Sequence, residues 1–222
     1  MRRVPEPELM DDPVHAAAYA AADFDDAHSR ILMAFEQFFP RVEVAGPVLD
    51  LGCGPGDIGF RFAARFPDAE IIGVDGAPAM LALAQQRKVS DAVLGPRMNF
   101  VEGLLPDAPV PTLTYAAIIS NSLLHHLHDP AVLWEMVNRH AGSDTYIFIA
   151  DLFRPQSTAA ARHLVEQYAA TEPEVLRRDF FHSLCAAFEP DEIEAQLATA
   201  GLHGLSVDLL GDRHLVVHGL KD

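Results

Sequence analysis

The sequence is poor in cysteine, in basic residues and in long apolar runs, and each shortage excludes a class of protein. Cys53 and Cys185 are its only cysteines, too few for a disulfide framework or a cysteine-rich zinc site. Lys and Arg total 16 against 32 Asp and Glu, a net charge of −16, which disfavours nucleic acid and anionic membranes as partners. No apolar run is long enough for a membrane span, and residues 1–13 lack the apolar stretch of a signal peptide. We therefore expect a cytoplasmic protein.

The composition predicts a single domain. Half of the 222 residues are hydrophobic, which is enough to bury a core, and the length suits one domain if all strands share one sheet. We divide residues 1–222 into an N-terminal arm and lid helix (1–40), a central core (41–155), a helical lid insertion (156–189) and a helix with a C-terminal hairpin (190–222).

Short apolar runs alternate with helical segments through the central core. Strands are predicted at 48–51, 70–75, 98–101, 115–120 and 146–150, with helices at 57–66, 78–86 and 130–140. Continuous apolar strands are typical of parallel sheets that are covered by helices on both faces. Strands at 205–210 and 213–218, joined by a two-residue turn at Gly211-Asp212, predict a closing hairpin. The pattern predicts an α/β fold with a doubly wound, mostly parallel seven-stranded sheet and an antiparallel C-terminal strand.

The segments outside the core are predicted to be mainly helical. Apolar residues at helical spacing predict one helix over 15–39, and three prolines predict a loose arm over 1–13. Residues 156–189 contain no strand-like run and predict about two helices, which would form a lid. A further helix is predicted at 190–200, ended by Gly201.

The first predicted strand runs directly into a glycine-rich loop, Gly52-Cys53-Gly54-Pro55-Gly56. Glycines allow a tight turn and let a ligand lie against backbone amides. Asp75 ends the next strand, and in a βαβ unit its carboxylate lies beside such a loop, where it can accept hydrogen bonds from both hydroxyls of a ribose. The pattern predicts a nucleoside site at the carboxyl edge of the sheet. Replacing Asp75 with alanine should abolish binding there with little loss of stability.

Two kinds of nucleoside ligand fit this loop. Gly54, Gly56 and Gly59 satisfy the dinucleotide pattern G-x-G-x-x-G, so an NAD(P)- or flavin-dependent oxidoreductase is one alternative. Two features oppose it: the loop is longer than a tight dinucleotide turn, and Asp50 and Asp57 place negative charge where a pyrophosphate would bind. Acids in these positions favour a ligand that carries an ammonium and a sulfonium.

These motifs resemble those of the class I S-adenosylmethionine (SAM) dependent methyltransferases. The similarity covers roughly residues 40–220 and is carried by residues 48–56, 73–75 with Met80, 118–129 and 151–155. It implies a Rossmann-like fold in which residues 41–155 bind SAM, and transfer of a methyl group to a small molecule by in-line displacement with S-adenosylhomocysteine as product. Within the family, the similarity points to small-molecule enzymes of the ubiquinone and menaquinone biosynthesis type. A non-catalytic SAM-binding protein remains an alternative.

The resemblance also implies a set of cofactor contacts along the carboxyl edge. Asp50 would hold the ammonium of SAM and Asp75 its ribose, with the methionyl part at one end of the set and adenine at the other. Leu104 stands where many members of the family have an acid, which leaves the adenine amine to the backbone or to Glu102. From the methionyl end, the implied residues are Asn121, Gly52, Gly54, Gly56, Asp50, Asp75, Gly76, Met80, Gly103 and Leu104.

Methyl transfer needs a base only when the acceptor must lose a proton. His125, His126 and Asp151 lie on loops at the carboxyl edge and are candidate bases or substrate anchors. The His-His-x-His-Asp pattern also fits metal ligands, but adjacent histidines on a helix point in different directions, so we expect no metal. Candidate substrate contacts in the lid segments are Tyr19, Arg177 and His182. A small-molecule substrate is expected, and a homodimer is compatible with the sequence.

Overall fold

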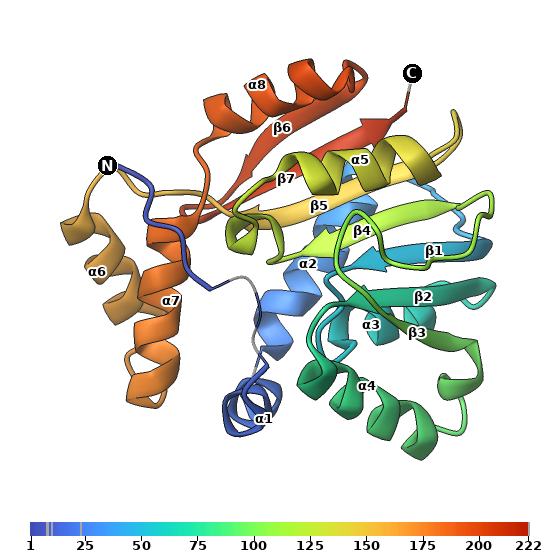
Figure 1. Ribbon diagram of the computed structural model, residues 1–222, viewed down its shortest axis with the longest axis horizontal. Coiled ribbons are helices and arrows are strands. Elements are labelled where there is room, and N and C mark those ends of the chain that lie inside the picture. The colour runs from blue at the N-terminus through green and yellow to red at the C-terminus, as the bar shows by residue number, and fades with distance from the viewer. Residues whose placement is uncertain (8, 10, 23, 222) are drawn as a thin grey trace.

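Seven strands form one sheet at the centre of the molecule (Figure 1). The computed structural model describes residues 1–7, 9, 11–22 and 24–221. The strand order is β3-β2-β1-β4-β5-β7-β6. The first five strands are parallel, and β7 runs antiparallel between β5 and β6, which confirms the predicted fold class. The strands are β1 (Gly46–Leu51), β2 (Ala69–Asp75), β3 (Met98–Glu102), β4 (Ala117–Asn121), β5 (Tyr146–Leu152), β6 (Leu205–Leu210) and β7 (His214–Leu220).

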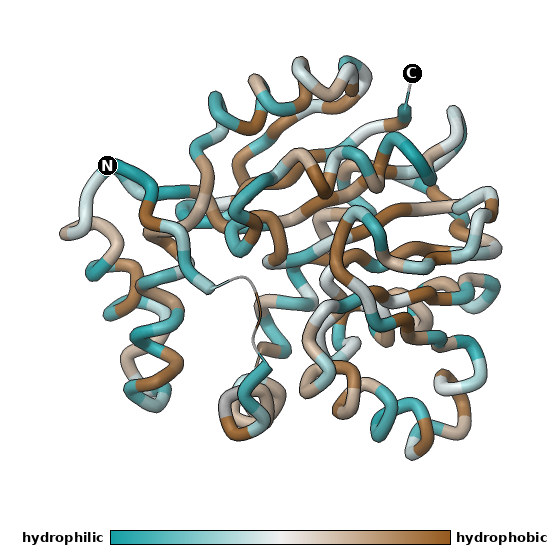
Figure 2. The backbone as a smooth tube through the Cα atoms, in the orientation of Figure 1, coloured by the Kyte–Doolittle hydropathy of each residue, from teal (hydrophilic) through white to brown (hydrophobic). Residues whose placement is uncertain are grey.

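Helices cover both faces of the sheet, and the hydrophobic colouring of the central strands in Figure 2 follows from this arrangement. On one face Phe148 of β5 packs with Phe35, their ring centroids 5.4 Å apart. On the other face, Ile147 and Ile149 pack in the same core as Trp134. Burial on both faces explains why the strands are continuous apolar runs. The first face is covered by α2 (Asp25–Phe38) and α3 (Asp57–Arg65), the second by α5 (Ala131–His140) and α8 (Pro190–Ala200).

The strand order reverses between β1 and β4, and this reversal positions the site. In doubly wound sheets, ligands bind where the chains that leave two neighbouring strands diverge to opposite faces. Leu51 at the end of β1 pairs in register with Ser120 of β4, and the Ser120 hydroxyl donates a 2.7 Å hydrogen bond to the Leu51 carbonyl. The glycine loop after β1 and the histidine segment after β4 therefore lie at the same edge.

The single helix predicted for residues 15–39 is wrong, because the chain forms two helices there. α1 (Pro13–Ala21) packs against α4 (Pro78–Ser90), whereas α2 packs against α3. One straight helix cannot pack against both α4 and α3, so the chain breaks into two. The Tyr19 and Phe24 rings pack across the break, 4.9 Å apart, and acids in the first turn of α2 suit a new helix start.

Residues 1–7 form no helix or strand, as predicted for the arm, but they are held against residues 156–189 rather than loose. The Val4 amide donates to the Cys185 carbonyl at 3.0 Å, and the N-terminal amine donates to the Gln156 carbonyl at 3.1 Å. Residues 156–189 contain α6 (Thr158–Tyr168) and α7 (Glu174–Ala186), which lie next to the arm in Figure 1. None of the described helices has the length and apolar content of a membrane span.

The turn of the C-terminal hairpin differs by one residue from its prediction. Leu210 pairs with His214, so the turn has three residues, 211–213, rather than the two predicted. Gly211 has φ +81°, a conformation that glycine adopts without strain.

Candidate active site

The glycine loop has the backbone conformation that its sequence requires. Gly52, Gly54 and Gly56 have φ values of +68°, +53° and +85°, all in the left-handed region that favours glycine. A Cβ on Gly52 would lie 2.8 Å from Leu123, whereas one on Gly54 would meet no described atom within 4 Å. The loop therefore presents bare backbone with open space above Gly54.

Asp75 lies against this loop, as the βαβ pattern predicts. Its Oδ2 accepts a 2.8 Å hydrogen bond from the Gly54 amide, and its Oδ1 accepts one of 2.8 Å from the Ala77 amide. Burial raises the pKa of the Asp75 carboxyl, and these amides partly offset that effect. The carboxylate is thus both a candidate ribose ligand and a clamp on the loop.

Asp50 is the strongest sign that the site fits a cationic ligand. Asp50 is 1% exposed, and its Oδ2 has no hydrogen-bond partner among the described residues. Burial, and then the charge of Asp75, raise the pKa of Asp50 to about 7. A buried carboxylate oxygen without a partner is costly, and the ammonium of SAM would supply both the missing donor and the opposite charge. The residues present therefore fit the cofactor.

The raised pKa of Asp50 predicts that SAM affinity depends on pH. The ammonium prefers ionised Asp50, so affinity should rise as pH increases through about 7 and then level off. Below that point, each pH unit should weaken binding by up to about tenfold, with uptake of SAM releasing a proton. Calorimetric titration in two buffers of different ionisation enthalpy measures both effects. Asp50→Asn should remove the pH dependence, and an identical profile in that variant would contradict this role.

Asp57 does not act as the free negative charge that the sequence suggests. Its carboxylate binds His28 Nδ1 at 2.5 Å, Arg61 Nε at 2.7 Å and Arg87 at 2.8 Å. Burial raises the pKa of Asp57, but hydrogen bonds from these three partners outweigh burial and bring it below its ordinary range. The sequence-based argument that Asp57 repels a pyrophosphate is therefore wrong, while the argument from Asp50 stands.

Replacing Asp57 with asparagine should lower the free energy of unfolding by roughly 1–3 kcal/mol, because His28, Arg61 and Arg87 lose their common carboxylate. Since the pKa is depressed in the fold, this stabilisation should be present at neutral pH and be lost as pH falls through the folded pKa. Urea denaturation measures the loss. The exposed loop acid in Asp144→Asn is the control, with an expected change below about 0.5 kcal/mol; equal effects in both variants would contradict the prediction.

The residues predicted to flank adenine lie around the end of β2 and β3. Leu104 is 61% exposed and covers Gly76, where an added Cβ would lie 2.5 Å from its Cδ2. The Gly103 amide donates to the Asp75 carbonyl at 3.0 Å. Met80 is buried with Ala16 of α1, so it also belongs to the contact between α1 and α4.

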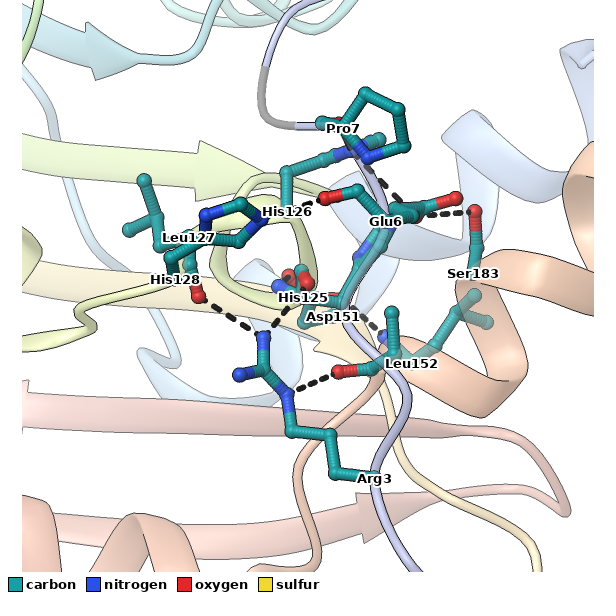
Figure 3. Close-up of polar contacts among 11 residues, drawn as sticks. Arg3, Glu6, Pro7, His125, His126, Leu127, His128, Asp151, Leu152 and Ser183 are labelled. Carbon is teal, nitrogen blue, oxygen red and sulfur yellow. Dashed lines mark hydrogen bonds and ion pairs between the residues drawn. The ribbon is translucent and has the colours of Figure 1, made fainter.

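His125, which follows β4, and Asp151 of β5 form a buried dyad (Figure 3). His125 Nδ1 bonds to Asp151 Oδ1, and the His125 amide donates to Oδ2 at 3.2 Å. Burial lowers the pKa of His125, but the charge of Asp151, its hydrogen bond and the charge of Glu6 together outweigh burial, and the pKa is raised. Burial likewise opposes ionisation of Asp151, but His125 holds its pKa below the ordinary value. The dyad uses His125 Nδ1, and His125 Nε2 faces the Glu6 carboxylate at 3.5 Å.

The structure adds two residues that the sequence analysis missed, Arg3 and Glu6 of the arm. The Arg3 guanidinium donates to the carbonyls of His125, Leu127 and Ala186. Glu6 Oε1 accepts a hydrogen bond from Ser183 at 3.0 Å and faces His125 and His126. Arg3 precedes Pro5, and Glu6 lies between Pro5 and Pro7. Neither residue belongs to a periodic pattern, so no signal in the sequence could have placed them here.

The predicted substrate contacts fall into two groups. Burial, and then the charges of Asp57, Asp75 and Asp151, raise the pKa of Tyr19 to about 12, so α1 carries its hydroxyl toward the carboxylates of the site. Burial raises the pKa of Glu6, and the charge of His182 is one of the effects that partly offset this rise. Arg177 instead pairs with Glu166 of α6 at 2.6 Å and links the two lid helices. Asn121 is half-buried at the end of β4.

A sheet of this order, with a glycine loop after β1 and an acid at the end of β2, is a Rossmann-like fold. Residues 48–141 match the family described as "Methyltransferase domain". The chain has a TM-score of 0.68 to a SAM-dependent methyltransferase from Aquifex aeolicus, with 16% identity over 95% of this chain and 99% of that one. The plantazolicin methyltransferase BpumL, solved with SAH, gives 0.70 with 13% identity over 95% and 91%.

The curated relatives of this chain are also named as methyltransferases. A trans-aconitate 2-methyltransferase of Methylobacterium radiotolerans is 40% identical over 114 residues, 50% of this chain and 39% of that protein. One from Yersinia pestis is 31% identical over 153 residues, 63% of this chain and 55% of that protein. The chain spans about half the length, or less, of these relatives. The chain is thus similar in sequence to part of these methyltransferases and in fold to the solved ones.

Proposed function

We propose that the chain transfers a methyl group from SAM to a small-molecule acceptor. The observation that carries this proposal is the unpartnered, buried Oδ2 of Asp50 at the glycine loop, because a ligand with an ammonium fits it and a pyrophosphate does not. In this proposal Asp50 binds the ammonium, Asp75 the ribose and Leu104 the adenine, while Gly52, Gly54, Gly56 and Asn121 surround the methionyl part.

When bound, SAM supplies a methyl group on a positively charged sulfur. A lone pair of the acceptor forms the bond to the methyl carbon while the carbon–sulfur bond breaks, and the sulfur keeps the electron pair in S-adenosylhomocysteine. The protein has to hold the three atoms in line and keep water out. The lid helices, α1 and the arm close this edge of the sheet, which suits the second task.

The His125–Asp151 dyad gives the acceptor side its chemistry. Asp151 fixes the ring through Nδ1, so Nε2 can take the proton of an acceptor hydroxyl or amine, or as an imidazolium can hold an acceptor carboxylate. We favour a carboxylic acid as the first acceptor to test. The relatives are named trans-aconitate methyltransferases, and Nε2 already faces a carboxylate, that of Glu6.

Calorimetric titration with SAM, S-adenosylhomocysteine and NAD, followed by transfer of a radiolabelled methyl group, tests the proposal. We expect the first two ligands to bind, NAD not to bind, and label to reach trans-aconitate or another small acid in a cell metabolite extract. Tight binding of NAD without a response to SAM would favour the oxidoreductase alternative. Binding of SAM without any labelled product would favour the non-catalytic alternative.

Three features remain predictions from the sequence: a cytoplasmic location, the lack of a nucleic-acid partner, and a homodimer as a candidate assembly. The net charge of −16 supports the second. Light scattering after size-exclusion chromatography measures the mass of the particle and so tests the third.

A further inference from the structure

We propose that Glu6, His125 and His126 form a binding site for a divalent transition-metal ion of the Zn²⁺ type. Their ligand atoms, Glu6 Oε1, His125 Nε2 and His126 Nδ1, all lie within 4.8 Å of one another, and Figure 3 shows the three side chains converging. Two imidazoles and one carboxylate are a ligand set that zinc accepts, with a fourth position left open.

The separations between these atoms suit a metal better than direct hydrogen bonds. Glu6 Oε1 lies 3.5 Å from His125 Nε2 and 3.4 Å from His126 Nδ1. A charge-assisted hydrogen bond between such groups would be about 2.7–2.9 Å. Two ligand atoms that are each about 2.0–2.1 Å from a tetrahedral zinc ion lie roughly 3.3–3.4 Å apart, which is close to both observed distances.

The two histidine rings face the same way, whereas adjacent histidines on an α-helix would point in different directions. They lie on η2 (Leu124–His126), a single 3-10 turn rather than an α-helix. Their ring centroids are 4.3 Å apart with an interplanar angle of 35°. The geometric reason for expecting no metal therefore does not hold in this structure.

The surrounding contacts orient two of the three ligands, His125 and Glu6. Metal-binding histidines usually donate their second ring N–H to a carboxylate, and His125 Nδ1 bonds to the buried Asp151. Glu6 is fixed by the Ser183 hydroxyl at 3.0 Å. The three hydrogen bonds from Arg3 to carbonyls of the histidine segment and α7 hold the arm, and hence Glu6, in this position. The site is thus assembled only when the arm is docked.

This inference does not rest on the proposed function, because the ligand set is defined without SAM. A metal and a proton compete for His125 Nε2, so in the metal-loaded protein His125 would act as a ligand rather than as a base. An oxygen of a carboxylic acid acceptor could fill the open fourth position.

Metal titration of the untagged, full-length protein tests the proposal. After treatment with a chelator and dialysis, Zn²⁺ is titrated by calorimetry without SAM, and Co²⁺ is followed by its visible absorption. We expect one ion per chain and the absorption of a four-coordinate Co²⁺ site. Glu6→Gln and His126→Ala should each weaken binding by about 100-fold or more, and Asp151→Asn by about 10–100-fold. His163→Ala, which removes an exposed histidine of α6, should leave affinity unchanged.

Two results would overturn the metal site: no saturable binding of either ion, or equal affinity in the wild type and in the Glu6→Gln/His126→Ala double variant. The cluster would then be only an ion pair that holds the arm. Thermal melting without metal shows whether each variant is folded. Titration of the same samples with SAM separates this proposal from the proposed function, since zinc binding without SAM binding would leave the metal site standing and overturn the function.

Discussion

Replacing Asp75 with alanine should weaken the binding of SAM and S-adenosylhomocysteine by roughly 10²–10⁴-fold. A carboxylate that accepts hydrogen bonds from both ribose hydroxyls makes two charge-assisted bonds, each worth about 1.5–3 kcal/mol, and about 1.4 kcal/mol corresponds to a factor of ten in affinity. Calorimetric titration measures the change. A dissociation constant equal to that of the wild type would contradict the assignment of Asp75 to the ribose.

The same substitution should also cost stability, which differs from the expectation based on the sequence. Asp75 accepts hydrogen bonds from the Gly54 and Ala77 amides, so alanine leaves two amides without a partner, at about 1–3 kcal/mol. Asp75→Asn keeps one carbonyl acceptor, so its free energy of unfolding should be higher than that of Asp75→Ala. Glu70→Gln, at the exposed start of the same strand, is the matched control and should change neither affinity nor stability.

Replacing His125 with alanine should lower kcat for methyl transfer by roughly 10²–10⁴-fold, the usual contribution of a positioned acid or base. The affinity for SAM should stay close to that of the wild type, because His125 is not among the proposed cofactor contacts. Initial rates with radiolabelled SAM, together with a SAM titration, separate the two effects. A wild-type kcat would show that the dyad is structural.

The His125→Ala variant has to be compared with a second variant, because alanine leaves the buried Asp151 carboxylate without its imidazole partner. Breaking such a pair costs about 3–5 kcal/mol, so a loss of activity could reflect unfolding. Asp151→Asn retains the shape of the side chain while removing its charge, and should lower kcat in a protein that still melts cooperatively. His163→Ala is the control for removal of a histidine elsewhere. A loss of SAM affinity parallel to the loss of kcat would contradict a role limited to the acceptor.

The features that the sequence determined by itself are those with a local physical cause. An apolar strand buried on both faces is continuous in the sequence, so β1 to β5 could be placed within a few residues. Positive φ values at Gly52, Gly54 and Gly56 require glycine wherever the loop occurs, and Asp75 follows from the geometry of a βαβ unit. These local requirements were enough to predict the α/β fold, the glycine loop and the neighbouring acid.

Contacts between distant segments were decided only by the tertiary structure. Asp57 draws its partners from three helices, Arg3 and Glu6 reach the histidine segment from the far end of the chain, and α1 and α2 separate because each packs on a different helix. Ion pairs and hydrogen bonds of this kind depend on which surfaces meet after folding, and they leave no periodic pattern along the chain. The glycine loop, Asp75 and the candidate residues His125, His126 and Asp151 could therefore be predicted from the sequence. The contacts of Arg3 and Glu6 with the histidine segment could not.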